Sequence, residues 1–544
     1  MLNNLARRAA GQARRQAIMV KTMTQAGIVR PYRPDHLAAA TKSLVDWGMG
    51  FAGGIRAQAA LNPDGVALID ERGSLTWSEI DERSTRLANA LADRGVLERD
   101  GVAVLCRNHR YFLEVSTALS KLGADILYLN TAFAAPQLGE VCEREKPVAI
   151  VYDEEFEGLI DASGIQGPRY LGWADGEVER ESAEDLIAAG HVRVPKPPEH
   201  FSRPVILTSG TTGTPKGAPR SEAGMDAAVA LLSKLDFKAG DIVHIAAPVF
   251  HTWGWAHLNL AMLLGGTVVL RNRFDPADCL AALEEHRCTG LVVVPVMLQR
   301  ILALPAEQRS GDYRSLRTVA ASGSALPGDL ATEWMDTFGD NLYNTYGSTE
   351  VAWATIARPQ DMRAAPGTAG LAPPNTVIKI VDDQGKEVPR GESGRIFVGN
   401  SMLFDGYTGG GNNEVIDGLM STGDVGRMDT AGRLFVEGRD DEMIVSGGEN
   451  LFPKEVEDCI ARHDLVHDVA AIGVDDAEFG KRLRAFVVLV DSDGDQDHAT
   501  ATLKSWVKDN LARFKVPRDF IYIEELPRNA TGKVLKRVLA EWDE

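Results

Sequence analysis

The sequence predicts an α/β protein with an α+β tail, because short apolar runs alternate with helical periodicity over most of its length. From about Thr376 the pattern changes to short strands separated by Gly, Pro and Asp turns. The 544 residues exceed one ordinary core, so more than one domain is expected.

The first helix is expected within Gly73–Gly95, with Ser78 as its N-cap, Asp81 three residues later and Gly95 at its end. Extended and helical segments then alternate, and the same alternation continues from Ile242 to Leu330. The expected strands are 102–105, 126–129, 148–151, 267–270 and 290–294, and the expected helices are 111–122, 137–145 and 276–285. Two α/β halves with mostly parallel sheets follow from this alternation.

The last third of the chain is expected to contain a β-rich part and then a compact tail. Strands are predicted at 377–381, 394–398 and 434–436, and the tail has two helical and two strand-like segments of its own. We place a domain boundary at Asp441, which leaves about 100 residues for a small α+β domain. The predicted domains are thus 51–440 and 441–544, preceded by a basic helical extension at 1–50.

Composition excludes several classes of protein. The formal net charge of −19 disfavours a nucleic-acid partner, and no apolar run approaches the roughly 18 residues of a membrane span. The five cysteines are odd in number and have no CxxC spacing, so neither a disulfide framework nor a zinc site is predicted. A cytoplasmic location fits best.

The first 34 residues differ, because they contain seven Lys and Arg residues and no acid before Asp35. Three interpretations stay open: an amphipathic helix on anionic lipid, which would give peripheral membrane contact, an organellar transit peptide, or a basic helix packed on an acidic body. A homodimer also stays open.

The run Thr208–Gly217 is typical of a polyphosphate site, because it combines three glycines and several hydroxyls with Lys216. It is not an ordinary P-loop, since Pro215 precedes the lysine and Gly217 follows it, so a magnesium ligand must come from elsewhere. On composition alone, a flexible linker is the alternative.

Four further stretches concentrate polar chemistry: 344–350, 421–424, 438–450 and 527–533. Tyr346 could stack on a base, Thr349 could donate to a phosphate, and Glu350 could hold Mg²⁺. Asp424 could accept hydrogen bonds from both hydroxyls of a ribose. Each stretch alone also fits ordinary turn chemistry.

Together, the motifs T-S-G-T-T-G-x-P-K-G, Y-G-x-T-E, S-T-G-D, G-R-x-D and N-x-T-G-K resemble the adenylate-forming superfamily, in its acyl-CoA synthetase branch. The resemblance covers Leu75 to Lys533. It implies a large N-terminal domain of two α/β subdomains and a β-rich one, joined by a hinge at Asp441 to a small mobile C-terminal domain. It also implies ATP and Mg²⁺, with CoA as co-substrate.

The resemblance assigns roles to residues of this chain. Lys533, Glu350, Thr349 and Lys216 would be catalytic, and Glu350 would hold the metal. ATP and AMP would be bound by Thr208, Ser209, Gly210, Thr211, Thr212, Gly213, Lys216, Gly323, Ser324, Ala325, Asn344, Thr345, Tyr346, Gly347, Ser348, Thr349, Asp424 and Arg439. The acyl and CoA path would include His251, Trp253, Trp255, Gly447 and Gly448.

The expected reaction joins a carboxylate to the α-phosphate of ATP with release of pyrophosphate, followed by attack of the CoA thiol. His251 stands where amino-acid-activating relatives have Asp, so an α-amino acid is disfavoured, and a medium- or long-chain fatty acid is our first expectation. A fatty acyl-AMP ligase that serves a carrier protein and a non-catalytic nucleotide-binding protein are the alternatives, and a luciferase shares every motif.

Overall fold

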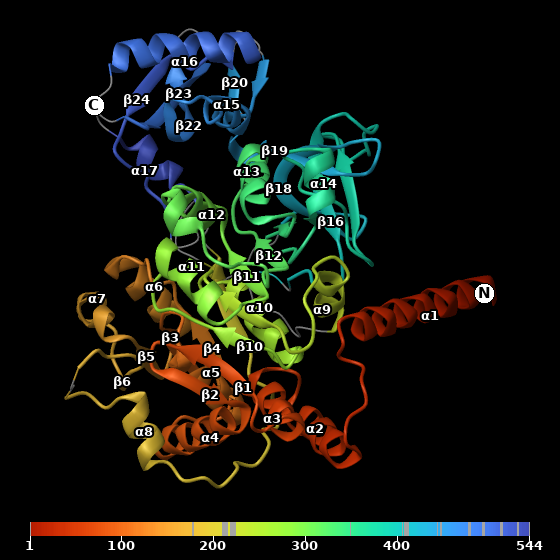
Figure 1. Cartoon of the computed structure of the whole chain (residues 1–544), viewed down its shortest axis with the longest axis vertical. Helices are drawn as coiled ribbons and strands as arrows, with labels where there is room; N and C mark the ends of the chain where they lie inside the picture. The colour runs from red at the N-terminus through yellow and green to blue at the C-terminus, as the bar shows by residue number, and fades with distance from the viewer. Residues whose placement is uncertain are drawn as a thin grey trace.

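A computed structural model gives the arrangement of the chain (Figure 1). It describes residues 2–176, 179–208, 216–217, 225–348, 350–404, 406, 413–442, 444–446, 449–476, 480–491, 495–511, 515–529 and 532–542. The two α/β halves and the β-rich part form one large body, and the C-terminal part lies at one end of the molecule.

The larger sheet has eight strands in the order β14-β13-β12-β11-β9-β10-β1-β2. Its interior is parallel, and only the edge pairs β13–β14 and β1–β2 are antiparallel. The strands are β1 (Val66–Asp70), β2 (Gly73–Thr76), β9 (Ile242–Ile245), β10 (Thr267–Val269), β11 (Gly290–Val293), β12 (Thr318–Ala321), β13 (Leu342–Tyr346) and β14 (Thr355–Ala357).

The second sheet has six strands in the order β6-β5-β3-β4-β7-β8, parallel except for the last pair. They are β3 (Gly101–Leu105), β4 (Asp125–Tyr128), β5 (Ala149–Tyr152), β6 (Arg169–Leu171), β7 (Pro204–Thr208) and β8 (Lys216–Gly217). Val102 and Val104 belong to a core shared with the larger sheet, whereas Ala103 and Leu105 face a separate core. Each face of β3 is therefore buried, as the continuous apolar run predicts.

Helices cover both sheets. They are α2 (Pro34–Trp47), α3 (Phe51–Leu61), α4 (Trp77–Asp93), α5 (Arg110–Leu122), α6 (Ala135–Glu145), α7 (Glu157–Ser163), α8 (Ala183–Ala189), α9 (Met225–Leu232), α10 (Thr252–Leu263), α11 (Pro276–Glu285), α12 (Pro295–Leu302), α13 (Gly328–Phe338) and α14 (Pro359–Ala364). The predicted α/β class with mostly parallel sheets is confirmed.

The predicted start of α4 is wrong by two residues. Thr76, not Ser78, is the N-cap: its hydroxyl accepts the N–H of Glu79 at 3.2 Å, and the Glu79 carboxylate accepts the N–H of Thr76 at 2.7 Å. This capping box also ends β2, because the same residue closes the strand and opens the helix.

An antiparallel sheet forms the β-rich part, with β15 (Val377–Val381), β16 (Gly394–Gly399), β17 (Val415–Ile416), β18 (Leu419–Met428) and β19 (Leu434–Arg439). Its own small core contains Ile396, Val398 and Leu434. β18 and β19 matter for function, because they carry two of the predicted nucleotide-binding motifs side by side.

The C-terminal part has a core of its own, which includes Val456, Leu503 and Val507. Its elements are the hairpin β20 (Ile444–Ser446) and β21 (Glu449–Leu451), the sheet β22 (Val466–Asp476), β23 (Gly480–Leu489) and β24 (Asp519–Tyr522), and the helices α15 (Pro453–Ile460), α16 (Gln496–Asn510) and α17 (Lys536–Ala540). The predicted small α+β fold of the tail is confirmed.

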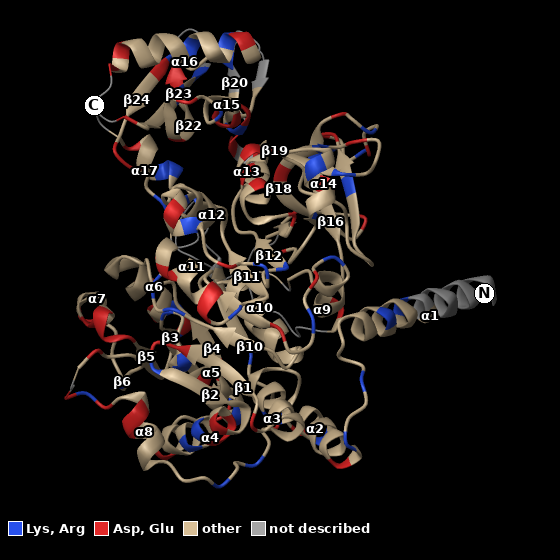
Figure 2. Cartoon of the chain, in the orientation of Figure 1, with Lys and Arg blue, Asp and Glu red and all other residues tan. Residues whose placement is uncertain are grey.

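Helix α1 (Leu2–Gln25) projects from the body and packs near α9 (Figure 1). Met23 and Ala26 are buried there, and the carbonyl of Ala26 accepts the N–H of Ala239 at 2.7 Å. Acidic and basic residues are spread over the rest of the chain (Figure 2). Among the described residues, no helix has the length and apolar character to cross a bilayer.

Candidate active site

The ends of the predicted phosphate loop are paired. Thr208 closes β7 and Lys216 opens β8, and the two residues are antiparallel partners. The loop residues Ser209 to Gly213, together with Thr349, Gly447 and Gly448, lie outside the described residues. Ser446 and Glu449 are likewise paired in the hairpin that flanks the two glycines.

Two segments predicted to bind adenine lie next to each other. Gly323 to Ala325 follow β12, and Asn344 to Tyr346 form the end of the neighbouring parallel strand β13. The hydroxyl of Ser322 donates to the carbonyl of Thr345 at 2.7 Å. Gly323 has φ +95°, a conformation that L side chains rarely adopt, so the chain turns sharply after β12.

The structure also brings together Tyr346, Asp424 and Arg439, which come from three different motifs. The phenol of Tyr346 donates to Asp424 Oδ2 at 2.5 Å, and Arg439 Nη1 lies 3.5 Å from Asp424 Oδ1. Burial, reinforced by the neighbouring carboxylate, raises the pKa of Tyr346 well above its ordinary value, so the phenol stays a donor. This cluster sits at the carboxyl end of β13, beside the adenine-binding segments.

The pairing of β18 with β19 explains why Asp424 and Arg439 meet, because they are register partners in that ladder. Gly423 has φ +73°, and a Cβ there would lie 3.0 Å from Arg439 Nη1. The glycine therefore leaves room for the guanidinium. Sequence order alone does not give this contact; it needs the antiparallel register.

Residues after β13 close the turn that leads to Glu350. Ser348 Oγ accepts the N–H of Glu350 at 3.2 Å, and the carbonyl of Glu350 accepts the N–H of Phe404 at 2.8 Å. A Cβ on Gly347 would lie only 2.3 Å from the carbonyl of Ala352, so the turn requires glycine. Glu350 is a half-buried residue at the same end of the sheet.

Lys533 lies on a tight turn of the C-terminal part. Its N–H donates to Asn529 Oδ1 at 2.9 Å, and its carbonyl accepts the N–H of Asn529 at 2.9 Å. Arg528 donates to the carbonyl of Gly532 and to Asp468, both at 2.6 Å. Sequence reasoning gave Arg528 and Asn529 no role of their own, although Asn529 begins the N-x-T-G-K motif and Arg528 precedes it.

The turn that carries Lys533 rests against the large body at the start of α12 (Figure 1). A Cβ on Gly532, whose φ is +77°, would lie 2.5 Å from Val296 Cγ1. Nearby, Gln299 Nε2 donates to the carbonyl of His467 at 3.0 Å. The C-terminal part thus contacts the large body through the segment that holds the candidate catalytic lysine.

Asp441, the predicted hinge, lies in a short 3₁₀ turn, Asp440–Glu442. The next residue, Glu442, pairs with Lys536 Nζ at 2.9 Å, and Glu457 pairs with the same ammonium at 3.0 Å. Burial alone would lower the pKa of Lys536, but the two carboxylates outweigh it and raise that pKa. Sequence reasoning did not identify this triad.

Three of the five residues predicted for the acyl and CoA path, His251, Trp253 and Trp255, lie at the start of α10. Trp253 Nε1 donates to the carbonyl of Val293 at 3.1 Å, and Trp255 packs edge-on against Phe51 with ring centroids 6.2 Å apart. Both tryptophans contact the core of the large body. His251 precedes the helix, and its buried Nε2 has no hydrogen-bond partner among the described residues.

Three histidines near this region should make stability depend on pH. Burial lowers the pKa of His244, His251 and His257 to about 4. Because each folded-state pKa lies below the unfolded value, the stabilisation is present above about pH 6.5 and is lost as the pH falls toward 4. From pH 7 to 5 we expect a loss of roughly 2 kcal/mol for each histidine.

The His244→Asn variant tests this expectation. Asparagine can keep the 2.9 Å hydrogen bond to the carbonyl of Val269 but cannot titrate, so its urea midpoint should fall less between pH 7 and 5 than that of the wild type. The His498→Asn variant, at an exposed position, is the control and should behave like the wild type. Equal pH dependence in all three proteins would contradict the assignment.

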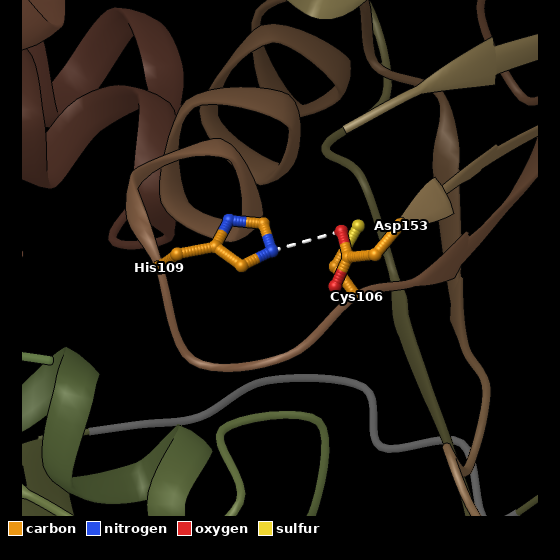
Figure 3. A group of neighbouring side chains, drawn as sticks. All are labelled: Cys106, His109 and Asp153. Atoms are coloured by element: carbon orange, nitrogen blue, oxygen red, sulfur yellow. Dashed lines mark hydrogen bonds and ion pairs between the residues drawn. The ribbon is translucent and has the colours of Figure 1, made fainter. Parts of the chain in front are cut away.

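Cys106, His109 and Asp153 form a buried group, whose ligand atoms lie within 4.8 Å of one another (Figure 3). His109 Nδ1 accepts the N–H of Tyr111 at 3.2 Å, so Nε2 carries the proton and donates to Asp153 Oδ1 at 2.9 Å. Burial, followed by the effect of Asp153, raises the pKa of the Cys106 thiol well above its ordinary value. A neutral thiol and a protonated Nε2 suit a hydrogen-bond network better than a metal ion.

Comparison with known proteins agrees with this geometry. A family model described as AMP-binding enzyme matches residues 55–408, and one described as AMP-binding enzyme C-terminal domain matches residues 455–533. A feruloyl-CoA synthase from an Amycolatopsis species is 34% identical over 490 residues, which cover 88% of this chain and 96% of the relative.

An indoleacetate–CoA ligase from Aromatoleum aromaticum is 32% identical over 490 residues, 88% of this chain and 95% of that protein. The solved structure of an o-succinylbenzoate CoA synthetase from Bacillus subtilis, in complex with its acyl-adenylate intermediate, matches with a TM-score of 0.78 and 27% identity, over 90% of this chain and 98% of that one. The chain therefore belongs to the AMP-binding enzyme family and is an AMP-forming acid–thiol ligase, which activates a carboxylic acid with ATP and ligates it to CoA.

Proposed function

We propose that ATP binds where the carboxyl ends of β12 and β13 meet β18 of the antiparallel sheet. The observation that carries this proposal is the contact of Tyr346, Asp424 and Arg439, because it joins motifs distant in sequence at one place. Adenine would lie between Gly323–Ala325 and Asn344–Tyr346. The carboxylate of Asp424 would accept hydrogen bonds from the ribose hydroxyls while Arg439 holds its other oxygen.

The phosphates would extend from the ribose toward the Thr208–Lys216 loop, whose ends are paired in β7 and β8. Thr349 would donate to the α-phosphate. Glu350 fits Mg²⁺, since this half-buried residue follows the strand that presents adenine and hard cations prefer oxygen ligands. When bound, Mg²⁺ would reduce the negative charge of the phosphates that the carboxylate substrate must approach.

In the first step, a carboxylate oxygen of the acid attacks the α-phosphorus, and the bond from that phosphorus to pyrophosphate breaks. Two anions meet in this step, so charge neutralisation is the main task of the protein. Lys216 would hold the departing pyrophosphate, and Lys533 would lie where the new bond forms. The seating of its turn on α12 supports an arrangement suited to this step.

In the second step, the CoA sulfur attacks the acyl carbonyl, AMP leaves, and the thiol proton is released. We propose that the C-terminal part, residues 441–544, rotates about Asp441 between the two steps. The turn at Gly447–Gly448 would then replace Lys533, and the lack of side chains would leave space for a thin pantetheine arm.

For the acid, we propose a compact substrate with an aromatic ring. The named substrates of the two relatives and the solved structure all contain a ring. The surroundings of His251 agree, because the ring centroid of Phe250 lies 6.5 Å from that of the imidazole and the neutral Nε2 offers a hydrogen-bond partner to a ring substituent. The medium- or long-chain fatty acid predicted from the sequence is the competing substrate.

A panel of acids tests both the reaction and the substrate. Purified enzyme with ATP and Mg²⁺ is given acetate through palmitate, benzoate, ferulate and indoleacetate, with and without CoA, and AMP and acyl-CoA are measured. We expect AMP and acyl-CoA in equal amounts with aromatic acids, and at least tenfold lower kcat/KM for aliphatic acids of similar length.

The outcomes separate the alternatives. Highest kcat/KM with a C8 to C16 acid would restore the fatty-acid prediction and reject the aromatic one. AMP without acylation of CoA would favour a carrier protein as acceptor. No AMP with any acid, and no trapping of the acyl group by hydroxylamine, would leave only nucleotide binding.

A further inference from the structure

The connection from β9 to α10 is held by a side chain from the other sheet. Asn108 lies between β3 and α5, and it is buried with 6% of its surface exposed. Its Nδ2 donates to the carbonyls of Ile245, at 3.1 Å, and Ala247, at 2.9 Å. Its Oδ1 accepts the N–H of Val249 at 2.9 Å.

These three hydrogen bonds fix the connection just before the proposed acyl site. Ile245 ends β9, whereas His251 is the N-cap residue of α10, so the segment between them sets where the imidazole lies. The amide of Asn108 uses both of its N–H groups and its oxygen on this segment alone.

Asn108 is itself held in place from the opposite side. Asp153 Oδ2 accepts the N–H of Arg107 at 2.7 Å, and Asp153 Oδ1 pairs with His109 Nε2 at 2.9 Å (Figure 3). Both neighbours of Asn108 are therefore tied to the end of β5. The buried group around Asp153 is not assigned a role in the reaction, but its hydrogen bonds hold the backbone on both sides of Asn108 in place.

We propose that Asn108 is a positioning residue for the acid substrate, which acts by fixing the 246–251 connection of the other sheet. This inference rests on the proposed acyl site at His251. Loss of the amide removes the partner that Asn108 gives to two carbonyls and one N–H, and the connection is expected to shift until they regain one. This shift would weaken binding of the acid, whereas binding of ATP at β12, β13 and β18 would not change.

Asn341 provides a matched control. It is equally buried, with 5% exposed, and its Nδ2 donates to the carbonyls of Leu316 and Phe338 at 3.2 and 3.1 Å. Its Oδ1 accepts Trp334 Nε1 at 3.1 Å. It precedes β13, at the amino end of the parallel strands, whereas the proposed nucleotide site lies at their carboxyl end. Replacement of Asn341 removes the same number of side-chain hydrogen bonds without changing the 246–251 connection.

The test compares Asn108→Ala and Asn341→Ala in the full-length enzyme with its best acid. We expect Asn108→Ala to raise KM for the acid about tenfold or more, with KM for ATP changed less than threefold. We also expect it to change the kcat/KM ratio between the best acid and its next homologue. Asn341→Ala should lower the thermal midpoint to a similar extent and leave both KM values and the ratio within threefold.

If Asn108→Ala does not fold, Asn108→Asp serves instead, because it keeps the shape and the acceptor for Val249 but places oxygen against the two carbonyls. Equal effects of the two positions on acid KM, or a destabilised Asn108 variant with unchanged acid KM and selectivity, would overturn the inference. A wild-type enzyme that forms no AMP with any acid would instead refute the proposed function, so the two failures are distinct.

Discussion

The Lys533→Ala variant is expected to lose the first step of the reaction and keep the second. Removal of one group that stabilises charge in a transition state typically costs about 100- to 1000-fold in rate. Pyrophosphate release from acid and ATP should therefore fall by at least 100-fold. Transfer of the acyl group from a supplied acyl-adenylate to CoA should stay within about threefold of the wild type, because Lys533 would be displaced in that step.

The exposed Lys508, on α16 of the same part of the chain, provides the control. Lys508→Ala removes the same charge far from the turn and should leave both steps unchanged. The role of Lys533 would be refuted if its variant lost both steps equally, since that result would indicate a general defect of the C-terminal part. Unchanged pyrophosphate release would refute it as well.

The Asp424→Ala variant is expected to raise KM for ATP by about tenfold to a hundredfold, with little change in KM for the acid. Hydrogen bonds to a charged group contribute about 1.5–3 kcal/mol, and this carboxylate is proposed to accept from the ribose. Its loss also leaves Arg439 and the phenol of Tyr346 without their present partner. Initial rates over a range of ATP concentrations measure the effect.

A second Asp–Arg pair on the same sheet gives the matched control. Asp429 follows β18 and pairs with Arg433 at 2.7 Å, outside the proposed site. Asp429→Ala should therefore leave KM for ATP unchanged. Tyr346→Phe, which keeps the ring and removes only the phenol, should raise KM for ATP less than Asp424→Ala does. Similar KM values in the two aspartate variants would exclude a ribose contact at Asp424.

The sequence was sufficient for the fold class and for recognising the motifs of the proposed nucleotide site, because both depend on local patterns. Alternating apolar runs predict parallel strands, and the run that contains Val102 to Leu105 is buried on both faces as expected. The pairing of Asp424 with Arg439 agrees with roles assigned through family resemblance. Their actual contact depends on the register of β18 and β19, which no local pattern encodes.

Residues that connect distant elements were missed for the same reason. In the sequence, Asn108 is one polar residue in a turn after a strand. Only the packing of the two sheets shows that its side chain binds the β9–α10 connection. Arg528 likewise resembles a surface arginine, yet it binds both Asp468 and the turn of Lys533. For α4, two hydroxyl residues separated by Trp77 could serve as N-cap, and pairing of Thr76 within β2 selects the first.

The triad of Lys536, Glu442 and Glu457 limits where the chain can bend. It fastens the residue directly after Asp441 to two helices of the C-terminal part, α15 and α17. Glu442 is thereby joined to the C-terminal part, and α17 follows closely after the turn of Lys533. If the C-terminal part rotates, the backbone dihedral angles before Glu442 would have to change. The triad would then keep the segment after Glu442 in place, so the rotation would not disturb the turn of Lys533.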